Sequence, residues 1–432
     1  MSSHKALLER YRQCYRDLDL FPLLTPEEIQ KFRVEYGEDS LARLEQAIDD
    51  APPDGKVVFA GHRGCGKSTL LFKFSKHMQQ ELGYFVAFFS IADMVEMSAV
   101  DHINILYSIA IQLLSRASER SIPIPDKTKN GVLSWMNTSR KETIAQGMSG
   151  EVGLGADLKI VQAQLKTEAS FREEMTKTFE RRISDLVKLV EDINHCIEIA
   201  TGKPVLVIID DLDKLDLKLV EEIYRNNLNA LFQPKIRVVF TIPIAAIRDI
   251  ELRTILNAAA GTPIQQLEVM KFWDWEHRND PDAVPNQDKV DLFVTLLQRR
   301  LDPDLMEPGI AEEMVLKSGG VMRELVRMAR ACCAHCSLIL RKDTERTDLK
   351  INHDILALAL RDLRNEFATS LGSSRYELLA ATHQDGTSAE VNDPEFLLLL
   401  HGLYVLEYRN GNVWYAVHPL VLDLLRQKEL IS

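Results

Sequence analysis

Short, continuous apolar runs alternate with longer segments of helical periodicity through the middle of this chain. Such runs are typical of strands that are buried on both faces, and the helical segments between them can cover those faces. The pattern therefore predicts an α/β fold in which a parallel sheet is covered by helices. The expected strands are residues 57–60, 84–89, 205–209, 236–240 and 264–269.

Segments outside this alternation divide the chain further. Residues 1–50 have helical spacing, with one helix expected to start at Pro26 and another to be capped by Asp39. Residues from about 121 to 201 exceed what one strand and two helices of the core require, and we interpret them as an insertion. Within it, residues 151–161 alternate like a strand or hairpin, and residues 163–199 follow a charged helical pattern. The expected domains are an N-terminal helical segment (1–50), a core (51–285) that carries the insertion, a helical lid (286–370) and a C-terminal domain (371–432).

The C-terminal domain carries a hairpin signal. Asn410-Gly411 stands between two β-prone runs, 403–408 and 413–417. An Asn-Gly pair favours the tight turn that joins two antiparallel strands. Helices followed by a hairpin are therefore expected after residue 371.

A glycine-rich loop follows the first expected strand and precedes a helix. Its spacing is G-x-x-x-x-G-K-S from Gly61 to Ser68. Glycines let successive backbone N–H groups turn toward phosphate oxygens, and the helix N-terminus adds positive potential. Lys67 is expected to reach the β- and γ-phosphates, and Ser68 to supply an oxygen to Mg²⁺. A chance glycine loop is the alternative, which the strand–loop–helix setting disfavours. ATP and Mg are the predicted cofactors, with Gly61, His62, Arg63, Gly64, Cys65, Gly66, Lys67, Ser68 and Thr69 as the cofactor-binding residues.

A second candidate site stands at the end of the aliphatic strand 205–209, where Asp210, Asp211 and Asp213 follow. Ligands collect at the carboxyl ends of strands in open α/β sheets. Asp210 is expected to hold Mg²⁺ through water, and Asp211 to polarise the attacking water. The alternative is an acidic turn that only ends the strand, and for Asp213 a helix cap or a salt bridge is as good an interpretation as catalysis.

Together, the phosphate loop, the Asp210-Asp211 pair and Thr241 at the end of the strand 236–240 resemble the AAA+ P-loop ATPases. Within them the chain is most similar to the STAND and origin-recognition-like branch, which carries a winged-helix domain after a helical lid. The resemblance covers roughly residues 30–115 and 200–430. Asp211 stands where AAA+ proteins commonly have Glu, and its shorter arm suits the slow hydrolysis of a switch. The insertion has no counterpart in the resemblance.

This resemblance implies further roles. Thr241 corresponds to the first sensor, although a hydroxyl satisfied by a local backbone bond is an equal alternative. Arg323 corresponds to the second sensor, which would contact the γ-phosphate; a surface arginine paired with an acid is the alternative. The expected catalytic residues are thus Lys67, Asp211, Thr241 and Arg323. If the protein assembles, one subunit would also supply an arginine finger to the next, for which the candidates are Arg248, Arg253, Arg172, Arg181 and Arg182.

Two other patterns carry weaker signals. Phe32, Arg33 and Val34 stand where the family packs adenine, but ordinary core packing explains them at least as well. Residues 332–336 contain three cysteines and His335 within one turn or so of a helix. Zinc ligands normally come from separated elements, so small buried residues in a lid helix are the favoured interpretation.

Composition limits the partners. Hydrophobic residues make up 46% of the chain and the formal net charge is −12, which disfavours a surface devoted to nucleic acid or anionic membrane. Residues 371–432 contain four Lys or Arg against eight Asp or Glu, so a DNA-binding role for this domain is also disfavoured. Six scattered cysteines, no apolar signal core and no apolar run of membrane-spanning length favour a cytoplasmic protein.

These observations predict an ATP-hydrolysing switch in which nucleotide between the core and the lid controls self-assembly or a protein effector. Proteins of this build often serve in bacterial antiviral defence or signalling, an expectation that rests on the resemblance alone. One rival is a nucleic-acid-associated ATPase of the loader or transposition-regulator type, using Arg172, Lys177, Arg181 and Arg182 or the lid arginines. Another is a scaffold that binds ATP with little turnover. A small-molecule kinase is the least favoured, because nothing resembles an acceptor pocket.

Overall fold

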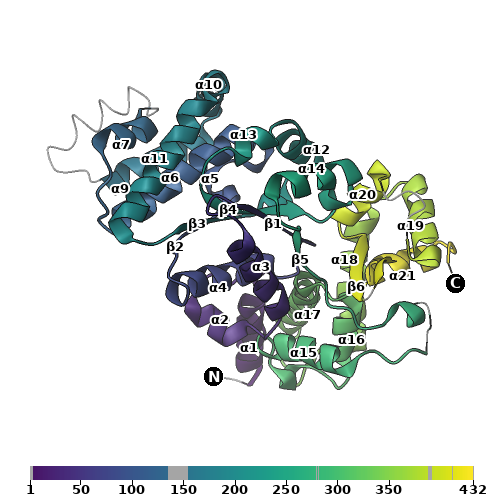
Figure 1. Ribbon diagram of the computed structural model, residues 1–432. Helices are drawn as coiled ribbons and strands as arrows, with labels where there is room; N and C mark the ends of the chain where they lie inside the picture. The colour runs from purple at the N-terminus through teal and green to yellow at the C-terminus, as the bar shows by residue number, and fades with distance from the viewer. Residues whose placement is uncertain are drawn as a thin grey trace. The chain divides into compact units, whose positions relative to one another are not determined.

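A computed structural model of the chain describes residues 3–134, 154–278, 280, 282–387, 392–410 and 412–431 (Figure 1). The chain divides into two compact units that do not follow its order. Unit 1 comprises Met1–Glu38, Gly61–Thr69 and Leu267–Ser432, and unit 2 comprises Asp39–Ala60 and Leu70–Gln266. The phosphate-loop segment is therefore grouped with the C-terminal third of the chain rather than with its sequence neighbours.

A five-stranded sheet with the order β2-β3-β4-β1-β5 confirms the predicted α/β fold. β2 pairs in parallel with β3, and β3 in parallel with β4. Every residue of β1, β3 and β4 is buried, which explains why their sequences lack a polar alternation. The strands are β1 (Lys56–Gly61), β2 (Phe85–Ser90), β3 (Val205–Asp210), β4 (Arg237–Pro243) and β5 (Gln265–Leu267).

The described residues of the predicted insertion are mainly helical, and they pack against helices that precede it. Helix α6 is capped by the side chain of Asp101 and lies against α9 and α11 (Figure 1). Tyr107 of α6 packs against Phe171 and Phe179 of α10. The helices are α5 (Ile91–Met94), α6 (His102–Glu119), α7 (Asp126–Leu133), α9 (Leu154–Thr167), α10 (Ala169–Arg181) and α11 (Ile183–Thr201).

The strand or hairpin expected at 151–161 is wrong for the described residues, because Leu154–Thr167 form helix α9. Residues 151–153 lie outside the described residues. The apolar positions that suggested alternation include Leu158 and Val161, which with Leu165 also satisfy a three- and four-residue spacing. These three side chains are buried together on the helix face. A short apolar run can satisfy both the two-residue period of a strand and the 3.6-residue period of a helix. Packing against α6 favours the helix.

Shorter elements complete unit 2. Expected helix starts hold to within a residue: Asp39 lies in the first turn of α3 rather than at its cap, since the helix begins at Glu38. The remaining elements are α3 (Glu38–Asp50), α4 (Lys67–Gln80), η1 (Met97–Ala99), η2 (Leu212–Lys214), α12 (Leu217–Glu221), the π-helix η3 (Glu222–Asn226), α13 (Leu228–Phe232), η4 (Ala246–Arg248) and α14 (Ile250–Ala260).

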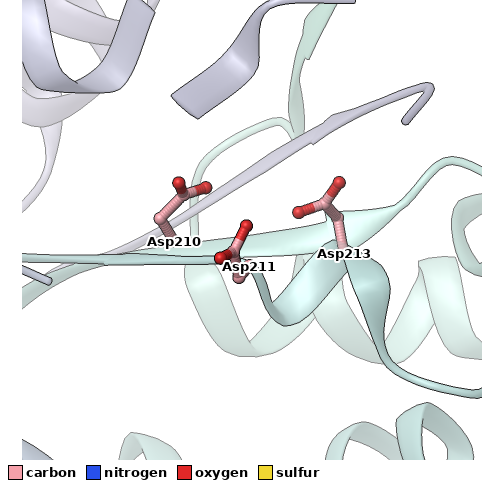
Figure 2. A group of neighbouring side chains, drawn as sticks. All are labelled: Asp210, Asp211 and Asp213. Atoms are coloured by element: carbon pink, nitrogen blue, oxygen red, sulfur yellow. The ribbon is translucent and has the colours of Figure 1, made fainter. Parts of the chain in front are cut away.

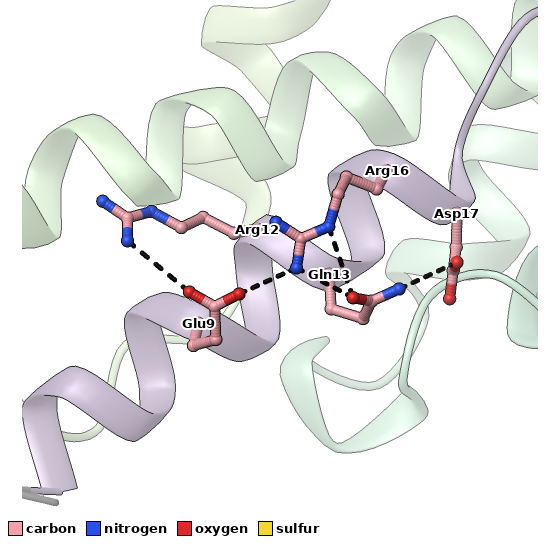
Figure 3. Close-up of polar contacts among 5 residues, drawn as sticks. All are labelled: Glu9, Arg12, Gln13, Arg16 and Asp17. Carbon is pink, nitrogen blue, oxygen red and sulfur yellow. Dashed lines mark hydrogen bonds and ion pairs between the residues drawn. The ribbon is translucent and has the colours of Figure 1, made fainter.

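Unit 1 begins with α1 (Ser3–Asp17) and α2 (Pro26–Phe32). α1 buries Tyr11, whose hydroxyl donates to the carbonyls of Leu305 and Leu349. Its exposed face carries a chain of polar contacts, shown in Figure 3, in which Glu9 accepts from Arg16 at 2.7 Å. That contact lowers the pKa of Glu9. α2 starts at the predicted Pro26, behind a Thr25 capping box.

Four helices form the predicted lid segment of unit 1. Gly319 and Gly320, both with positive φ, separate α16 from α17. Burial raises the pKa values of the Cys332, Cys333 and Cys336 thiols on α17, whereas His335 contacts Asp362 at 3.0 Å. The elements are η5 (Trp275–His277), α15 (Gln287–Gln298), η6 (Pro303–Leu305), α16 (Ile310–Lys317), α17 (Met322–Lys342) and α18 (His353–Ala368).

The C-terminal part of unit 1 contains the predicted hairpin. β6 and β7 pair antiparallel, with Asn410 opposite Asn412, while Gly411 lies outside the described residues. The elements are α19 (Ser373–Asp385), α20 (Pro394–His401), β6 (Val405–Asn410), β7 (Asn412–Val417) and α21 (Pro419–Gln427). Across the described residues, no helix is both long enough and apolar enough to cross a bilayer.

Candidate functional site

The phosphate loop of unit 1 has the backbone that its glycines predict. Gly64 and Gly66 have φ values of 78° and 91°, a region that L side chains rarely adopt. A Cβ at Gly64 would lie 2.7 Å from Cβ of Arg323, so close approach as well as backbone geometry requires glycine here. Helix α4 begins at Lys67, directly after the loop. The segment therefore combines a tight turn with a helix N-terminus, which is the arrangement that binds phosphate.

Polar contacts inside the loop hold its reactive side chains. The Lys67 ammonium is buried and donates to the carbonyls of Gly61 at 2.9 Å and His62 at 2.7 Å. The Cys65 thiol donates to the His62 carbonyl at 2.8 Å, so this cysteine fills space inside the turn. Thr69 Oγ1 accepts from the backbone of Leu23 at 2.9 Å, while Ser68 is partly exposed. The Lys67 side chain thus lies inside the loop and is held there by two backbone carbonyls of the loop.

Arg323, in the segment expected to form the lid, contacts the same loop. Arg323 N–H donates to the Gly64 carbonyl at 3.0 Å. In the described part of the chain, the Arg323 guanidinium makes neither a hydrogen bond nor an ion pair. The acid-paired surface arginine considered as the alternative is therefore absent among these residues. The structure brings Arg323 to the phosphate loop but leaves its charged end available.

In unit 2, the three acids at the carboxyl end of β3 form a compact cluster. One carboxylate oxygen from each of Asp210, Asp211 and Asp213 lies within 4.8 Å of the others (Figure 2). All three residues are buried. Carboxylate oxygens are the donors that Mg²⁺ prefers, so the cluster is a candidate site for this ion.

Asp211 has an unusual local environment. Its φ of 68° is left-handed, which Asp tolerates better than most residues. Ser90, at the end of β2, donates its hydroxyl to Asp211 Oδ2 at 2.6 Å, and Lys214 contacts Oδ1 at 2.5 Å. Both oxygens therefore have protein partners, and the carboxylate is fixed in direction.

Thr241 reaches the same turn from β4. Its hydroxyl donates to the Ile209 carbonyl at 3.1 Å and accepts from Leu212 N–H at 3.0 Å. The side chain is fully buried. These bonds match the local-backbone alternative for Thr241, and they pin the backbone on both sides of Asp210 and Asp211.

Arginine-finger candidates differ in exposure. Arg172 is buried and donates to the carbonyls of Leu165 and Lys166, and Arg248 is also buried. Neither can reach a second subunit without leaving its packing. Arg253, Arg181 and Arg182 are exposed and remain geometrically available.

The residues proposed for adenine lie in unit 1. Val34 is buried, and Arg33 contacts Glu38 and the Tyr36 carbonyl. Lys31 and Arg300 lie over the Phe32 ring, 4.5 and 5.0 Å from its centroid. These contacts describe ordinary packing of the segment.

Sequence reasoning missed Ser90 and Lys214, which contact the acidic turn, and Glu407 and His401, which contact the phosphate loop. Glu407 N–H donates to His62 Nε2 at 2.8 Å. Ser90 and Lys214 could have been suspected, because Ser90 ends a strand that neighbours β3 and Lys214 follows Asp211 by three residues. Glu407 is 345 positions from its partner and no local pattern indicates it.

Comparison with known proteins gives one family match and several distant structures. Residues 41–242 match the KAP family P-loop domain, and no curated protein matches the sequence. Among solved structures, Cdc6p from Pyrobaculum aerophilum aligns with a TM-score of 0.40 and 12% identity over 95% of this chain and 98% of that one. The ORC1 protein of Aeropyrum pernix in complex with DNA gives 0.38 and 10% over 94% and 96%, and Drosophila ORC bound to DNA gives 0.37 and 11% over 96% and 92%. The family match and the five-stranded sheet show an α/β P-loop NTPase fold.

Proposed function

We propose that this chain binds Mg-ATP and hydrolyses its β–γ phosphoanhydride bond slowly, as a molecular switch that controls self-assembly or a protein effector. The observation that carries the proposal is the phosphate loop, in which two left-handed glycines precede a helix that starts at the buried Lys67. Backbone donors, a helix N-terminus and an ammonium group together suit a triphosphate better than any neutral ligand.

The acidic cluster supports a role for magnesium. Asp210 would hold the ion, and the three converging carboxylates provide the oxygen donors that it prefers. When bound, Mg²⁺ neutralises charge on the phosphate oxygens. The fit lies in donor type and burial: three carboxylate oxygens lie within 4.8 Å of one another, and oxygen is the donor that Mg²⁺ prefers.

Hydrolysis would depend on Asp211. Its carboxylate is fixed by Ser90 and Lys214, and a fixed carboxylate can orient a water molecule and accept its proton. Because Lys214 already contacts one oxygen, that contact must loosen or be shared for Asp211 to act as a base. This supports slow turnover, which a switch requires more than a motor does.

Arg323 would sense the γ-phosphate. Its backbone is bonded to Gly64 and its guanidinium has no protein partner in the described residues. A guanidinium can bind phosphate in a bidentate manner, and loss of that contact on hydrolysis would release the lid segment. A winged-helix identity for residues 371–432 and the domain boundaries given above belong to the same proposal.

Two measurements on one preparation test the proposal. Calorimetry with MgATP should detect binding, and phosphate release should be slow and should stop when EDTA removes the metal. Mass photometry with and without a non-hydrolysable analogue should show a nucleotide-dependent change in mass, or in the fraction bound to an effector. Binding without any phosphate release would leave only the scaffold interpretation, and absence of binding would end the proposal.

A further inference from the structure

The outer side of the phosphate loop is attached to the C-terminal hairpin. His62, the second residue of the loop, is only 2% exposed, and its Nε2 accepts a hydrogen bond from Glu407 N–H at 2.8 Å. Glu407 lies in β6, which has β7 on its other side. The unpaired edge of a strand carries backbone donors that need acceptors. His62 supplies one, so its Nε2 must be unprotonated in this arrangement.

The next residue of the loop makes a second connection to the same domain. Arg63 donates to His401 Nε2 at 2.6 Å, and His401 is the last residue of α20. α20 leads through Leu403 into β6. Two successive side chains of the loop are thus bonded to two successive elements of the C-terminal domain.

The glycine pair before α17 links the loop and the hairpin a third time. Val321 packs with Leu406, Tyr408 and Trp414 in one buried cluster, and its Cγ1 lies 3.3 Å from where a Cβ of Gly64 would be. The Tyr408 hydroxyl donates to the Gly319 carbonyl at 2.6 Å. A displacement of the hairpin would therefore disturb the contact surface on which the loop rests.

We propose that His62 is a positioning residue that couples nucleotide occupancy of the phosphate loop to docking of the C-terminal hairpin. This inference rests on the proposed function. It states the sign of the coupling: the docked hairpin holds the loop in the conformation that binds nucleotide, and bound nucleotide stabilises the docked hairpin. The contacts to the hairpin and lid use the side chains of His62 and Arg63 and the carbonyl of Gly64. None of these three contacts uses an N–H group of the loop backbone.

The physical reason is preorganisation. A glycine-rich loop has many backbone conformations, and nucleotide binding must select one of them. Contacts that select the same conformation beforehand raise the affinity. By linkage, nucleotide must then strengthen those contacts by the same factor. Loss of nucleotide would loosen the hairpin, which gives the switch a defined moving part.

Hydrogen exchange of the parent protein tests this coupling directly. The Glu407 amide exchanges only when its bond to His62 opens, so we expect the Mg complex of AMP-PNP to slow its exchange about 5- to 50-fold relative to the nucleotide-free protein. Amides of α11, in the other unit, should change much less. An unchanged rate at Glu407, with the analogue bound as shown by calorimetry, would overturn the inference and leave the proposed function intact.

Two variants of His62 separate coupling from mere packing. His62→Phe removes the acceptor, and we expect AMP-PNP affinity to fall about 5- to 10-fold and Glu407 exchange to stop responding to the analogue. His62→Gln places Oε1 near the position of Nε2 and should restore both quantities to within about 2-fold. His353→Phe, at a ring that is 70% exposed on α18, is the matched control and should behave as the parent.

The outcomes distinguish the two hypotheses. Equal affinity and equal exchange response in His62→Phe and the parent would overturn the coupling alone. If the parent itself does not bind the analogue, the proposed function fails first and the coupling falls with it. If His62→Phe does not fold, exchange of the parent with and without analogue decides the question by itself.

Discussion

The phosphate loop and the acidic turn after β3 are held in place in different ways. The loop is made mainly of backbone, and its outer side is bonded to Glu407, which is 345 positions away. The acidic turn is made of side chains, and Thr241, which fixes its backbone, is 29 positions from Leu212. A phosphate site of this kind therefore depends on how the C-terminal domain docks, whereas the acids depend mainly on the neighbouring strands.

This difference predicts which substitutions alter turnover and which alter nucleotide binding. A substitution in the acidic turn should alter chemistry and leave nucleotide binding in place. A substitution in the loop, or in the domain that supports it, should alter binding. The following changes, from the largest expected effect to the smallest, can break or sharpen this contrast.

Asp211→Asn should have the largest effect on turnover. The amide keeps the shape of the side chain but cannot accept a proton, so we expect phosphate release to fall about 10²- to 10⁴-fold. Affinity for MgATP should stay within about 3-fold, because Asp211 is not among the residues expected to hold phosphate. Steady-state phosphate release and calorimetry on the same sample measure the two effects.

Asp213→Asn is the matched comparison within the acidic cluster, since Asp213 is equally buried and lies within 4.8 Å of the other two acids. If it slows turnover as strongly as Asp211→Asn, the assignment of the base to Asp211 is wrong. A weak effect would leave Asp213 as a support of the turn.

Lys67→Ala should remove binding. Charge-assisted hydrogen bonds to phosphate are each worth about 1.5–3 kcal/mol, so we expect MgATP affinity to fall roughly 10- to 150-fold. Two carbonyls of the loop also lose their donor, which adds to the effect. Lys76→Ala, at an exposed lysine of the same helix, should bind as the parent does. Equal affinity of the parent and Lys67→Ala would show that the loop does not hold the phosphates.

Acid should loosen the C-terminal support of the loop through His418. Burial, with a further contribution from Arg327, lowers the pKa of His418 to about 3 from 6.5. Because the folded state disfavours protonation, this stabilisation is complete above pH 6.5 and is lost progressively as the pH falls toward 3. At pH 5 the loss is about 2 kcal/mol in free energy of unfolding.

A variant separates this effect from general acid unfolding. His418 Nδ1 accepts from Leu420 N–H at the start of α21, and Asn can replace it as a cap. His418→Asn should therefore show a smaller decrease in unfolding midpoint between pH 7 and pH 5 than the parent, by thermal melts at matched ionic strength. An identical decrease in both proteins would assign the acid sensitivity to other groups.

Much of the fold could be predicted from the sequence because its signals are local. The apolar runs that became β1 to β5, the helix start at Pro26 and the pairing of β6 with β7 each depend on a few neighbouring residues. The error at 151–161 arose because a short apolar run satisfies two periods, and only contact with α6 selects the helix. The hydrophobic period alone could not distinguish a strand from a helix in that segment.

The candidate site could be predicted only in part, for the same reason. Phosphate-loop spacing and an acidic strand end are local patterns, so Lys67 and Asp210 could be named. The hydroxyl of Thr241 was open between two interpretations until its bonds to Ile209 and Leu212 were known. The contact of His62 with Glu407 requires the tertiary structure, since nothing in the sequence pairs positions that far apart.

Lys214→Met should have the smallest effect and tests how local the acidic turn is. Lys214 contacts Asp211 at 2.5 Å, but its side chain is 34% exposed, so solvent screens the ion pair. Pairs of this exposure are worth about 0.2–1 kcal/mol, so phosphate release should change less than about 5-fold, with a dependence on salt that the parent shows and the variant lacks. An increase in rate would mean that Lys214 restrains the base, and a small decrease would mean that it helps to orient it. A loss as large as that of Asp211→Asn would instead place Lys214 in the reaction, and the acidic turn could no longer be described as a carboxylate site supported by its neighbouring strands.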